Sequence, residues 1–252
     1  MVAEPLIPVR QRRFRYPGPA RTSDRAALEG ILFAARTGVT WNTLPTAAFG
    51  ASGATCWRRL KEWHEAGVWQ HLHELILAEL RAAGRLDLSA ALVDSSHLRA
   101  LGRGDLTGPS PVDRGKLGSK HHLITDATGI PLTVILNGGN RNDITQLLPL
   151  LDAVPPIRGL VGRPLRRPRR IYADRGYDFD KYRRLVRARG ITPHIARRNT
   201  GHGRHRWPVE RSIAWLHAFK KLRLRTERRA DIHQALISLA CSVICLRQLI
   251  LN

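Results

Sequence analysis

Residues 120–136 read Lys-His-His-Leu-Ile-Thr-Asp-Ala-Thr-Gly-Ile-Pro-Leu-Thr-Val-Ile-Leu, and this stretch indicates the type of fold. Two apolar runs, residues 120–125 and 130–136, flank Asp-Ala-Thr-Gly, a sequence typical of the turn of a β-hairpin. The stretch therefore predicts two consecutive antiparallel strands, to which the flanking sequence adds further strands.

Short apolar runs on both sides supply those strands. Upstream, residues 90–93 lead into Asp94, and a stretch rich in Gly and Pro, residues 101–118, predicts a mobile loop before the hairpin. Downstream, residues 171–173 and 192–196 are two more strands, and helical segments separate them. The predicted helices of this part cover residues 143–151, 179–189, 206–217 and 232–249, the last beginning with a capping box of Asp231 and Gln234. Antiparallel strands followed by alternating helices and strands predict an α/β (α+β) mixed sheet flanked by helices.

The N-terminal part predicts a small helical domain over residues 1–85, ahead of a sheet domain over residues 86–252. Three helices are predicted there, over about residues 24–36, 56–66 and 68–83. Asp24 is the expected N-cap of the first helix, and Thr55 is that of the second. The middle helix carries Arg58, Arg59 and Lys61, as the recognition helix of a helix-turn-helix-like domain does. A solvent-exposed helix face has the same pattern, so both interpretations stay open.

The charge of the chain is far from balanced. Its 42 Lys and Arg against 20 Asp and Glu give a net charge of +22. Residues 160–229 alone contain 22 Lys or Arg and 5 Asp or Glu, which accounts for +17 of that total. Such an excess predicts a polyanionic partner, most simply nucleic acid, with this stretch as the binding surface. The alternatives are a ribosome-associated protein and a surface charged for solubility.

Cysteine use and hydropathy predict a soluble cytoplasmic protein with no membrane partner. Cys56, Cys241 and Cys245 do not form a disulfide framework and have no His or Cys neighbours at zinc spacing, so we expect three core residues. No signal peptide opens the chain. The longest apolar stretch, residues 237–246, is shorter than the roughly 20 residues that a membrane span requires.

Three acidic residues are candidates for a metal site. Asp94 and Asp174 each follow an apolar run, and Glu210 lies on a predicted helix with Arg206 and His217 on the same face. Neighbouring carboxylates repel one another unless a cation offsets their charge, and Mg²⁺ prefers such oxygen ligands. Two ions there would hold a phosphodiester for cleavage. The alternatives are a turn-capping Asp94 and a surface ion-pair ladder around Glu210.

Several motifs occur in order along nearly the whole chain. They are Leu-Glu-Gly-Ile-Leu-Phe-Ala-Ala-Arg-Thr-Gly (28–38), Thr-Cys-Trp-Arg-Arg-Leu (55–60), Val-Asp-Ser-Ser-His (93–97), Gly-Pro-Ser-Pro-Val-Asp-Arg-Gly-Lys (108–116), Gly-Ser-Lys-His-His-Leu-Ile-Thr-Asp-Ala (118–127), Gly-Gly-Asn-Arg-Asn-Asp (138–143), Ala-Asp-Arg-Gly-Tyr-Asp (173–178) and Arg-Arg-Ala-Asp-Ile-His (228–233). Together with the segment around Glu210, they resemble the transposases of insertion-sequence family 5, which belong to the DDE group with an RNase H-like catalytic core.

The resemblance implies a bacterial transposase that binds terminal inverted repeats, cleaves DNA and transfers the strand. It implies Asp94, Asp174 and Glu210 as catalytic metal ligands, two Mg²⁺ ions for which Mn²⁺ can substitute, and double-stranded DNA, element ends and target, as partner. We also expect a homodimer or higher assembly on DNA and association with the nucleoid. The candidate DNA contacts are Arg58, Arg59, Lys61, Lys120, Arg175, Arg197, Arg198, Arg206, Arg211 and His217.

Two other functions remain open from the sequence. An RNase H-like nuclease would cut DNA but join nothing, and a strand-transfer assay separates it from a transposase. A decayed, non-catalytic derivative would bind DNA without cutting it.

Overall fold

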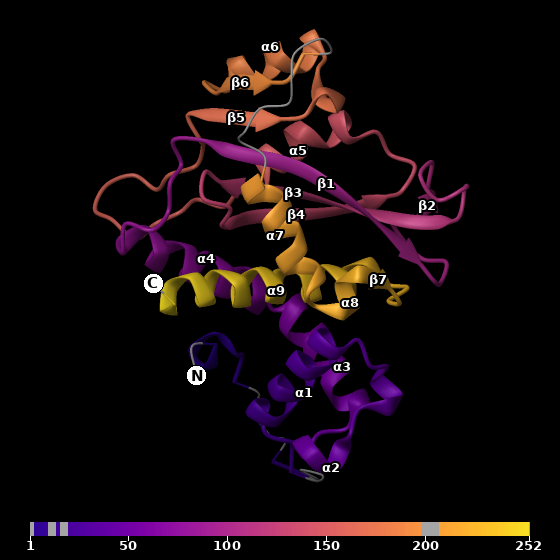
Figure 1. Ribbon diagram of the computed structural model, residues 1–252. Helices are drawn as coiled ribbons and strands as arrows, with labels where there is room; N and C mark the ends of the chain where they lie inside the picture. Colours follow the sequence, from indigo (N-terminus) through magenta and orange to yellow (C-terminus); the bar gives the residue numbers. More distant parts are fainter. Residues whose placement is uncertain (1–2, 10–13, 16–19, 198–206, 252) are drawn as a thin grey trace.

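The structure is a computed structural model that describes residues 3–9, 14–15, 20–197 and 207–251. Within these residues, a seven-stranded mixed sheet forms the centre (Figure 1). Its strands are β1 (Ala91–Ala100), β2 (Gly108–Pro109), β3 (Leu117–Asp126), β4 (Pro131–Gly138), β5 (Arg170–Ala173), β6 (Thr192–Ile195) and β7 (Leu224–Arg225). The order is β2-β3-β1-β5-β6, with β4 paired to β3 and β7 paired to β1.

Strand directions follow the predicted pattern. β1, β3 and β4 form an antiparallel meander, whereas β5 and β6 run parallel to β1 and are reached through helices. The turn between β3 and β4 is held by the buried side chain of Asp126, which accepts hydrogen bonds from the backbone N–H groups of Asp87, Thr128 and Ile130. The predicted mixed sheet and its hairpin are confirmed.

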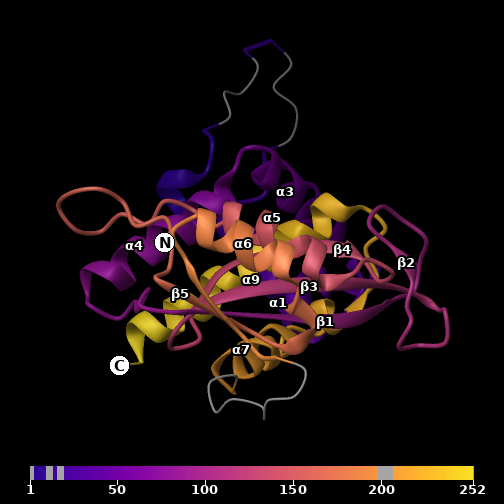
Figure 2. The same cartoon turned by 90° about the horizontal axis from the view of Figure 1, so that it is seen from above.

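Helices cover both faces of the sheet. They are α1 (Asp24–Thr37), α2 (Thr46–Phe49), α3 (Gly53–Glu65), α4 (Val68–Ala82), α5 (Leu147–Asp152), α6 (Asp180–Ala188), α7 (Trp207–His217), α8 (Lys220–Arg223) and α9 (Ala230–Ile250), with 3-10 turns at Glu4–Leu6, Trp41–Thr43, Asp143–Gln146 and Arg175–Tyr177. Figure 2 shows α5 and α6 on one face and α7 on the other. α9 packs on β4, α4 and α7, so it belongs to the face that α7 covers.

α9 is the one described helix that is long and apolar enough to cross a membrane by length and composition. Most of it is buried inside the protein, against α4 and β4. Its apolar character therefore belongs to the core. The three cysteines are free and buried, as predicted.

The N-terminal helices share one buried hydrophobic cluster with the sheet and with α9. α1 packs on α3 and α8, and α3 also contacts α9. The indole of Trp41 donates a hydrogen bond of 2.9 Å to Glu227, and the ammonium group of Lys221 lies 3.3 Å from the same carboxylate. The helical part is thus docked tightly onto the remainder, and a domain boundary at residues 85–86 stays a prediction.

Several details of the caps and loops differ from the sequence-based predictions. Ser23 and Ser52, and not Asp24 and Thr55, cap α1 and α3, because their hydroxyls accept the N–H groups of Ala26 and Thr55. The capping box at α9 is wrong, since its two members bond elsewhere: Asp231 pairs with Arg229, and Gln234 donates to the carbonyl of Val134. The stretch 101–118 contains β2, which pairs with β3.

Buried histidines predict that acid destabilises the protein. Burial lowers the pKa of His73 from 6.5 to about 4 and that of His233 to about 3. A folded-state pKa below the unfolded value means that the unfolded chain binds more protons, so stability is complete above pH 6.5 and is lost as the pH falls toward 4. Between about pH 7.5 and about pH 5, His73 alone should cost about 2 kcal/mol.

The variant His73→Gln tests this prediction by urea denaturation at both pH values. Its side chain can still donate to the carbonyl of Pro131, 3.0 Å from the imidazole, but does not titrate. We expect the pH-dependent loss of unfolding free energy to shrink by about 2 kcal/mol relative to the wild type. His71→Gln, an exposed histidine of the same helix, is the control. An unchanged pH dependence in His73→Gln would contradict the prediction.

Candidate active site

Asp94 and Asp174 lie at equivalent positions on neighbouring parallel strands. The β1–β5 register pairs Ala91 with Ile171, and each aspartate follows three residues later. Asp174 comes directly after β5, where its carboxylate accepts the N–H of Gly176 at 2.9 Å. A Cβ on Gly176 would lie 3.0 Å from that carboxylate, so glycine permits the close approach. Neighbouring strands are about 4.8 Å apart, which brings these two acids side by side.

β1 does not end at Asp94, contrary to the prediction, but runs on to Ala100. It can continue because β3 pairs with it as far as Arg99, and β7 pairs with its last two residues. Asp94 therefore lies in mid-strand, and only Asp174 stands at a strand end.

The pKa of Tyr177 is raised by burial and by the negative charge of nearby carboxylates. Burial raises the pKa of Tyr177 well above its usual value, and the carboxylates of Asp143, Asp94 and Asp174 raise it further, in that order. The Tyr177 hydroxyl has no partner of normal hydrogen-bond geometry among the described residues, although Ser95 lies beside it. Three carboxylates thus act on one buried phenol.

Glu210 lies on α7, which crosses β1 and β3. In the middle of α7, the Ser212 hydroxyl is hydrogen-bonded to the carbonyl of Gly129 in the β3–β4 turn. At its end, Nε2 of His217 lies 3.3 Å from the hydroxyl of Ser96. Side chains alternate along a strand, so Asp94 points to the same face of β1 as Ser96. α7 therefore covers the face from which Asp94 projects, and Glu210 is exposed on it.

The three acids do not form a ready-made metal site. In the described part of the chain, no group of three His, Cys, Asp or Glu side chains is placed to hold a metal ion. The donor chemistry nevertheless fits a hard divalent cation, since Asp94, Asp174 and Glu210 all offer carboxylate oxygens. β1 and the end of β5 carry two of these carboxylates, and α7, which contacts β1, carries the third.

Two of the predicted DNA contacts, Arg59 and Lys120, are buried and paired with carboxylates. Arg59 is only 4% exposed, because its guanidinium pairs with Asp24 at 2.6 Å and donates to the carbonyl of Thr22. Lys120 is 5% exposed and pairs with Asp143 at 2.7 Å. Both cations hold the fold together and are not available to a phosphate.

The other candidate DNA contacts differ in how exposed they are and in whether they pair with an acid. Arg58, Arg175 and Arg197 are exposed, while Lys61 pairs with Glu65 at 3.4 Å. Arg198 and Arg206 lie outside the described residues. These positions keep their role as predictions.

α7 presents a stacked row of side chains beside Glu210. The guanidinium of Arg211 lies between the rings of Trp207 and Trp215, 4.4 and 4.6 Å from their centroids. It also donates to the carbonyl of Thr128. Burial lowers the pKa of His217, and nearby Arg223 adds to this effect. His217 is therefore more readily neutral than an exposed histidine.

Sequence reasoning missed two residues of this region. They are Asp143 and Tyr177, neither of which is among the predicted site residues. The signal for Tyr177 was present, since it belongs to the stretch Asp-Arg-Gly-Tyr-Asp that contains Asp174.

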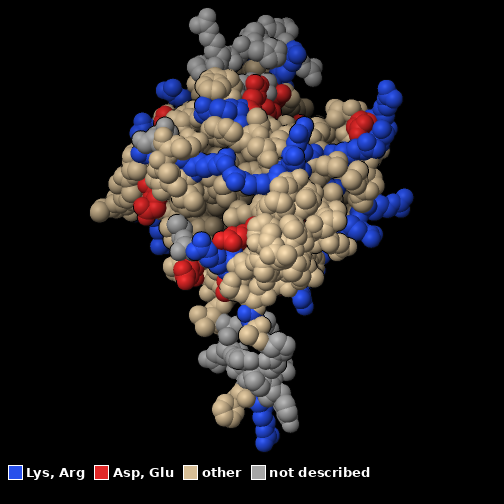
Figure 3. All heavy atoms as spheres, turned by 60° about the horizontal axis from the view of Figure 1, so that its bottom comes forward, with Lys and Arg blue, Asp and Glu red and all other residues tan. Residues whose placement is uncertain are grey.

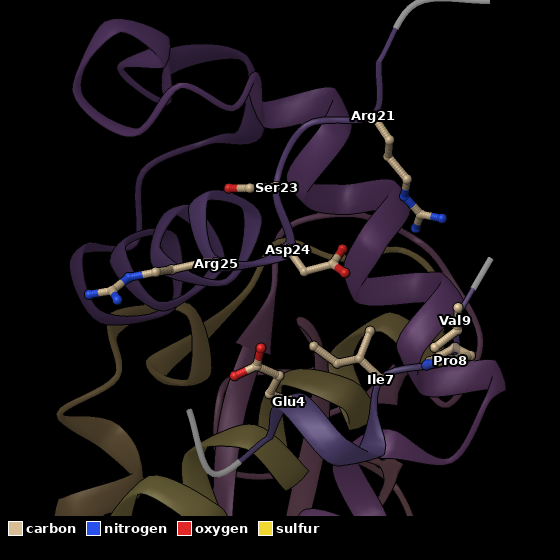
Figure 4. Close-up of a pocket in the computed structure, with 8 residues that line it drawn as sticks. All are labelled: Glu4, Ile7, Pro8, Val9, Arg21, Ser23, Asp24 and Arg25. Carbon is tan, nitrogen blue, oxygen red and sulfur yellow. The ribbon is translucent and has the colours of Figure 1, made fainter. Parts of the chain in front are cut away.

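A pocket of about 590 Å³ lies elsewhere, between the N-terminal segment and the start of α1 (Figure 4). Its lining mixes Glu4 and Asp24 with Arg21 and Arg25. Asp24 is paired with Arg59, and none of the three predicted metal-binding acids lines this pocket.

Comparison with known proteins defines the class. A family model described as "Transposase DDE domain" matches residues 85–245, and one described as "Putative transposase of IS4/5 family" matches residues 1–73. The chain belongs to the DDE transposases of the IS4/5 family. The sheet and its flanking helices are accordingly an RNase H-like core, and the predicted family, fold class and transposase function are confirmed.

Two relatives come from Burkholderia cepacia. The chain is 62% identical over 143 residues, 55% of its own length and 68% of the relative's, to the "Putative transposase for insertion sequence element IS402". It is 53% identical over 109 residues, 43% of its own length and 74% of the relative's, to the "Insertion element IS402 uncharacterized 16.2 kDa protein". As a DDE transposase, the protein is an enzyme that acts on DNA, and its family generally uses divalent metal ions.

Proposed function

We propose that Asp94, Asp174 and Glu210 are the metal-binding catalytic residues of this transposase. The observation that supports the proposal is the register of β1 and β5, in which Asp94 and Asp174 each follow three residues after the paired Ala91 and Ile171, together with the contact of α7 with β1. Their oxygens suit two Mg²⁺ ions, for which Mn²⁺ can substitute. Bound there, such ions would activate the attacking water or 3′-hydroxyl and stabilise the departing oxygen.

In this proposal the acidic residues bind the metal ions and nearby arginines bind the DNA. The carboxylates of Asp94 and Asp174 hold the site from the sheet, and Glu210 closes it from the helix. The exposed guanidinium groups of Arg175 and Arg197, next to the strand ends, bind phosphates of the DNA strand that is cut. This positions the backbone of an element end so that its 3′-hydroxyl, once released, can attack target DNA.

The N-terminal helices form the second part of the proposal. Residues 1–85 would bind the terminal inverted repeats through α3, on which Arg58 is exposed and Lys61 is half-buried. The protein would act in the cytoplasm, on the nucleoid, as a homodimer or higher assembly. Lys and Arg side chains outnumber Asp and Glu on the face that includes these helices (Figure 3).

Binding to an element end should weaken steeply as salt rises. Each phosphate neutralised by Lys or Arg contributes about −0.9 to the slope of log affinity against log salt. With four or more contacts we expect a slope of about −4 or steeper, measured by fluorescence anisotropy in EDTA. Arg58→Gln should flatten the slope by about 1, whereas Arg25→Gln, exposed on α1 and paired with Glu29, should change it little. A flat response of the wild type would rule out this DNA surface.

One observation favours a second candidate, the non-catalytic DNA-binding derivative. Within the described residues the three carboxylates are not assembled as one metal site. An assay with labelled element ends and a target plasmid separates the candidates. Joined products support the transposase, cut but unjoined ends support an RNase H-like nuclease, and bound, uncut ends support the derivative.

A further inference from the structure

The connection between α5 and β5 carries a charged surface that the proposed catalytic site does not use. Residues 153–173 contain six arginines and no Asp or Glu, and all six arginines are exposed. They are Arg158, Arg163, Arg166, Arg167, Arg169 and Arg170. The segment stands out from the body of the protein as a separate loop at the left of Figures 1 and 2. We call residues 157–170 the arginine hairpin.

The tip of the arginine hairpin is apolar. Leu160 is 56% exposed and Val161 is 106% exposed. Gly159 and Gly162 flank them with φ of +105° and +103°, a backbone conformation that residues other than glycine rarely adopt. Single exposed apolar residues are ordinary, but two adjacent ones at the tip of a basic loop form a small hydrophobic point surrounded by positive charge.

The base of the arginine hairpin is held firmly in place. Ile157 and Leu165 form an antiparallel bridge with two backbone hydrogen bonds of 2.8 and 2.9 Å. The guanidinium of Arg81 donates to the carbonyl of Ile157 at 2.6 Å. Gly159 lies so close to α4 that a Cβ there would be 2.0 Å from the carbonyl oxygen of Ala78. A preformed loop of this kind loses little conformational entropy when it binds a partner.

The chemistry of the arginine hairpin fits double-stranded DNA. Arginine forms bidentate contacts with phosphate and enters narrow minor grooves, and apolar side chains inserted from the minor groove unstack base steps. We propose that the arginine hairpin binds the minor groove of duplex DNA, with its guanidinium groups on the backbone and Leu160 and Val161 against the base edges. This inference rests on the proposed function and deepens it.

The arginine hairpin and the proposed catalytic residue Asp174 lie at opposite ends of β5. It enters β5 at the beginning of that strand, whereas Asp174 follows the end of the strand. Duplex bound by the hairpin is therefore a different portion from the one that is cut. Its variants should change DNA affinity and leave the reaction at saturating protein unchanged.

Fluorescence anisotropy of a labelled duplex of about 40 base pairs and arbitrary sequence tests whether the arginines of the hairpin contribute to DNA binding. The full chain is titrated in EDTA, so that metal chemistry plays no part. Arg163→Gln combined with Arg166→Gln should flatten the salt slope by about 2 and lower affinity at about 0.1 M salt by roughly 10- to 100-fold. The matched control, Arg25→Gln with Arg247→Gln, removes two exposed charges from α1 and α9 and should shift the slope by less than about 0.5.

The outcomes separate the two proposals. If the wild type shows no salt-dependent binding, the proposed function fails. If the wild type binds but both double variants flatten the slope equally, only the arginine hairpin is overturned. All four positions are exposed, and unchanged circular dichroism and thermal midpoints would verify folding.

The tip is tested separately with 2-aminopurine placed along the duplex, because this base becomes brighter when it is unstacked. Wild-type protein should raise the fluorescence, and Leu160→Ser with Val161→Ser should abolish the rise while leaving the salt slope unchanged, since apolar contacts release no counterions. No rise with the wild type, or an equal rise with the variant, would overturn insertion of the tip.

Discussion

Asp174→Asn is expected to lower the rate of DNA cleavage by about 10³-fold or more while element-end binding stays within a few-fold. The carboxylate is one of two that the β1–β5 register brings side by side, and the amide cannot supply the negative charge that a divalent ion requires. A metal ion provides several kcal/mol of transition-state stabilisation, and each 1.36 kcal/mol corresponds to about a factor of ten in rate. Cleavage of a labelled inverted-repeat duplex with Mg²⁺, and anisotropy in EDTA, measure the two quantities.

Asp94→Asn and Glu210→Gln should behave in the same way. Asp180→Asn is the matched control, because Asp180 is an exposed acid at the start of α6, a few residues after Asp174. Normal cleavage by Asp94→Asn or Asp174→Asn would refute the site. Normal cleavage by Glu210→Gln alone would limit the site to the two strand carboxylates and remove α7 from it.

Gly53→Ala should cause the largest loss of stability, about 3 kcal/mol or more. Gly53 begins α3, and a Cβ there would lie 1.6 Å from the carbonyl oxygen of Trp41. The obstacle is backbone, which cannot rotate aside as a side chain can, so the Trp41–Thr43 turn must move. That movement would also disturb the hydrogen bond from Trp41 to Glu227, which ties the helical part to the connection between β7 and α9. Overpacking commonly costs 1–3 kcal/mol, and a backbone clash lies at or above that range.

Urea denaturation measures the effect, with Gly50→Ala as the control. Gly50 has φ of +67° but nothing within 4 Å of an added Cβ, so its substitution should cost only about 1–2 kcal/mol of backbone strain. Equal losses for the two variants would show that close packing at Gly53 is not what holds α3. A Gly53→Ala protein that keeps its stability but loses end binding would instead show that α3 can shift without unfolding.

Local patterns were sufficient wherever neighbours in sequence decide the structure. The run from Lys120 to Leu136 predicted its hairpin because alternation and turn residues act over a few positions. The three N-terminal helices lie close to their predicted ranges, and the first is closed by Gly38 with φ of +78°. Those signals are local, so folding did not override them.

The candidate site was predicted in part for the same reason. Asp174 after an apolar run and two residues before Gly176 is visible in one short segment, and the structure places it directly after β5. Arg59 and Lys120 could not be told apart from exposed cations, because their partners, Asp24 and Asp143, lie 35 and 23 residues away in sequence. Only long-range packing decides whether a cation is shielded by a carboxylate or is open to DNA.

The sequence by itself determined the order of the longer strands and helices, the basic character of the chain and the family to which it belongs. These follow from periodicity, composition and ordered motifs, each of which is a property of the linear chain. Tertiary structure alone decided that Asp94 and Asp174 follow paired residues of β1 and β5, that the carboxylates of Asp143, Asp94 and Asp174 raise the pKa of Tyr177, and that the arginine hairpin stands away from the body. Contacts between distant segments depend on how β1, β5 and α4 pack together, and no local pattern encodes that packing.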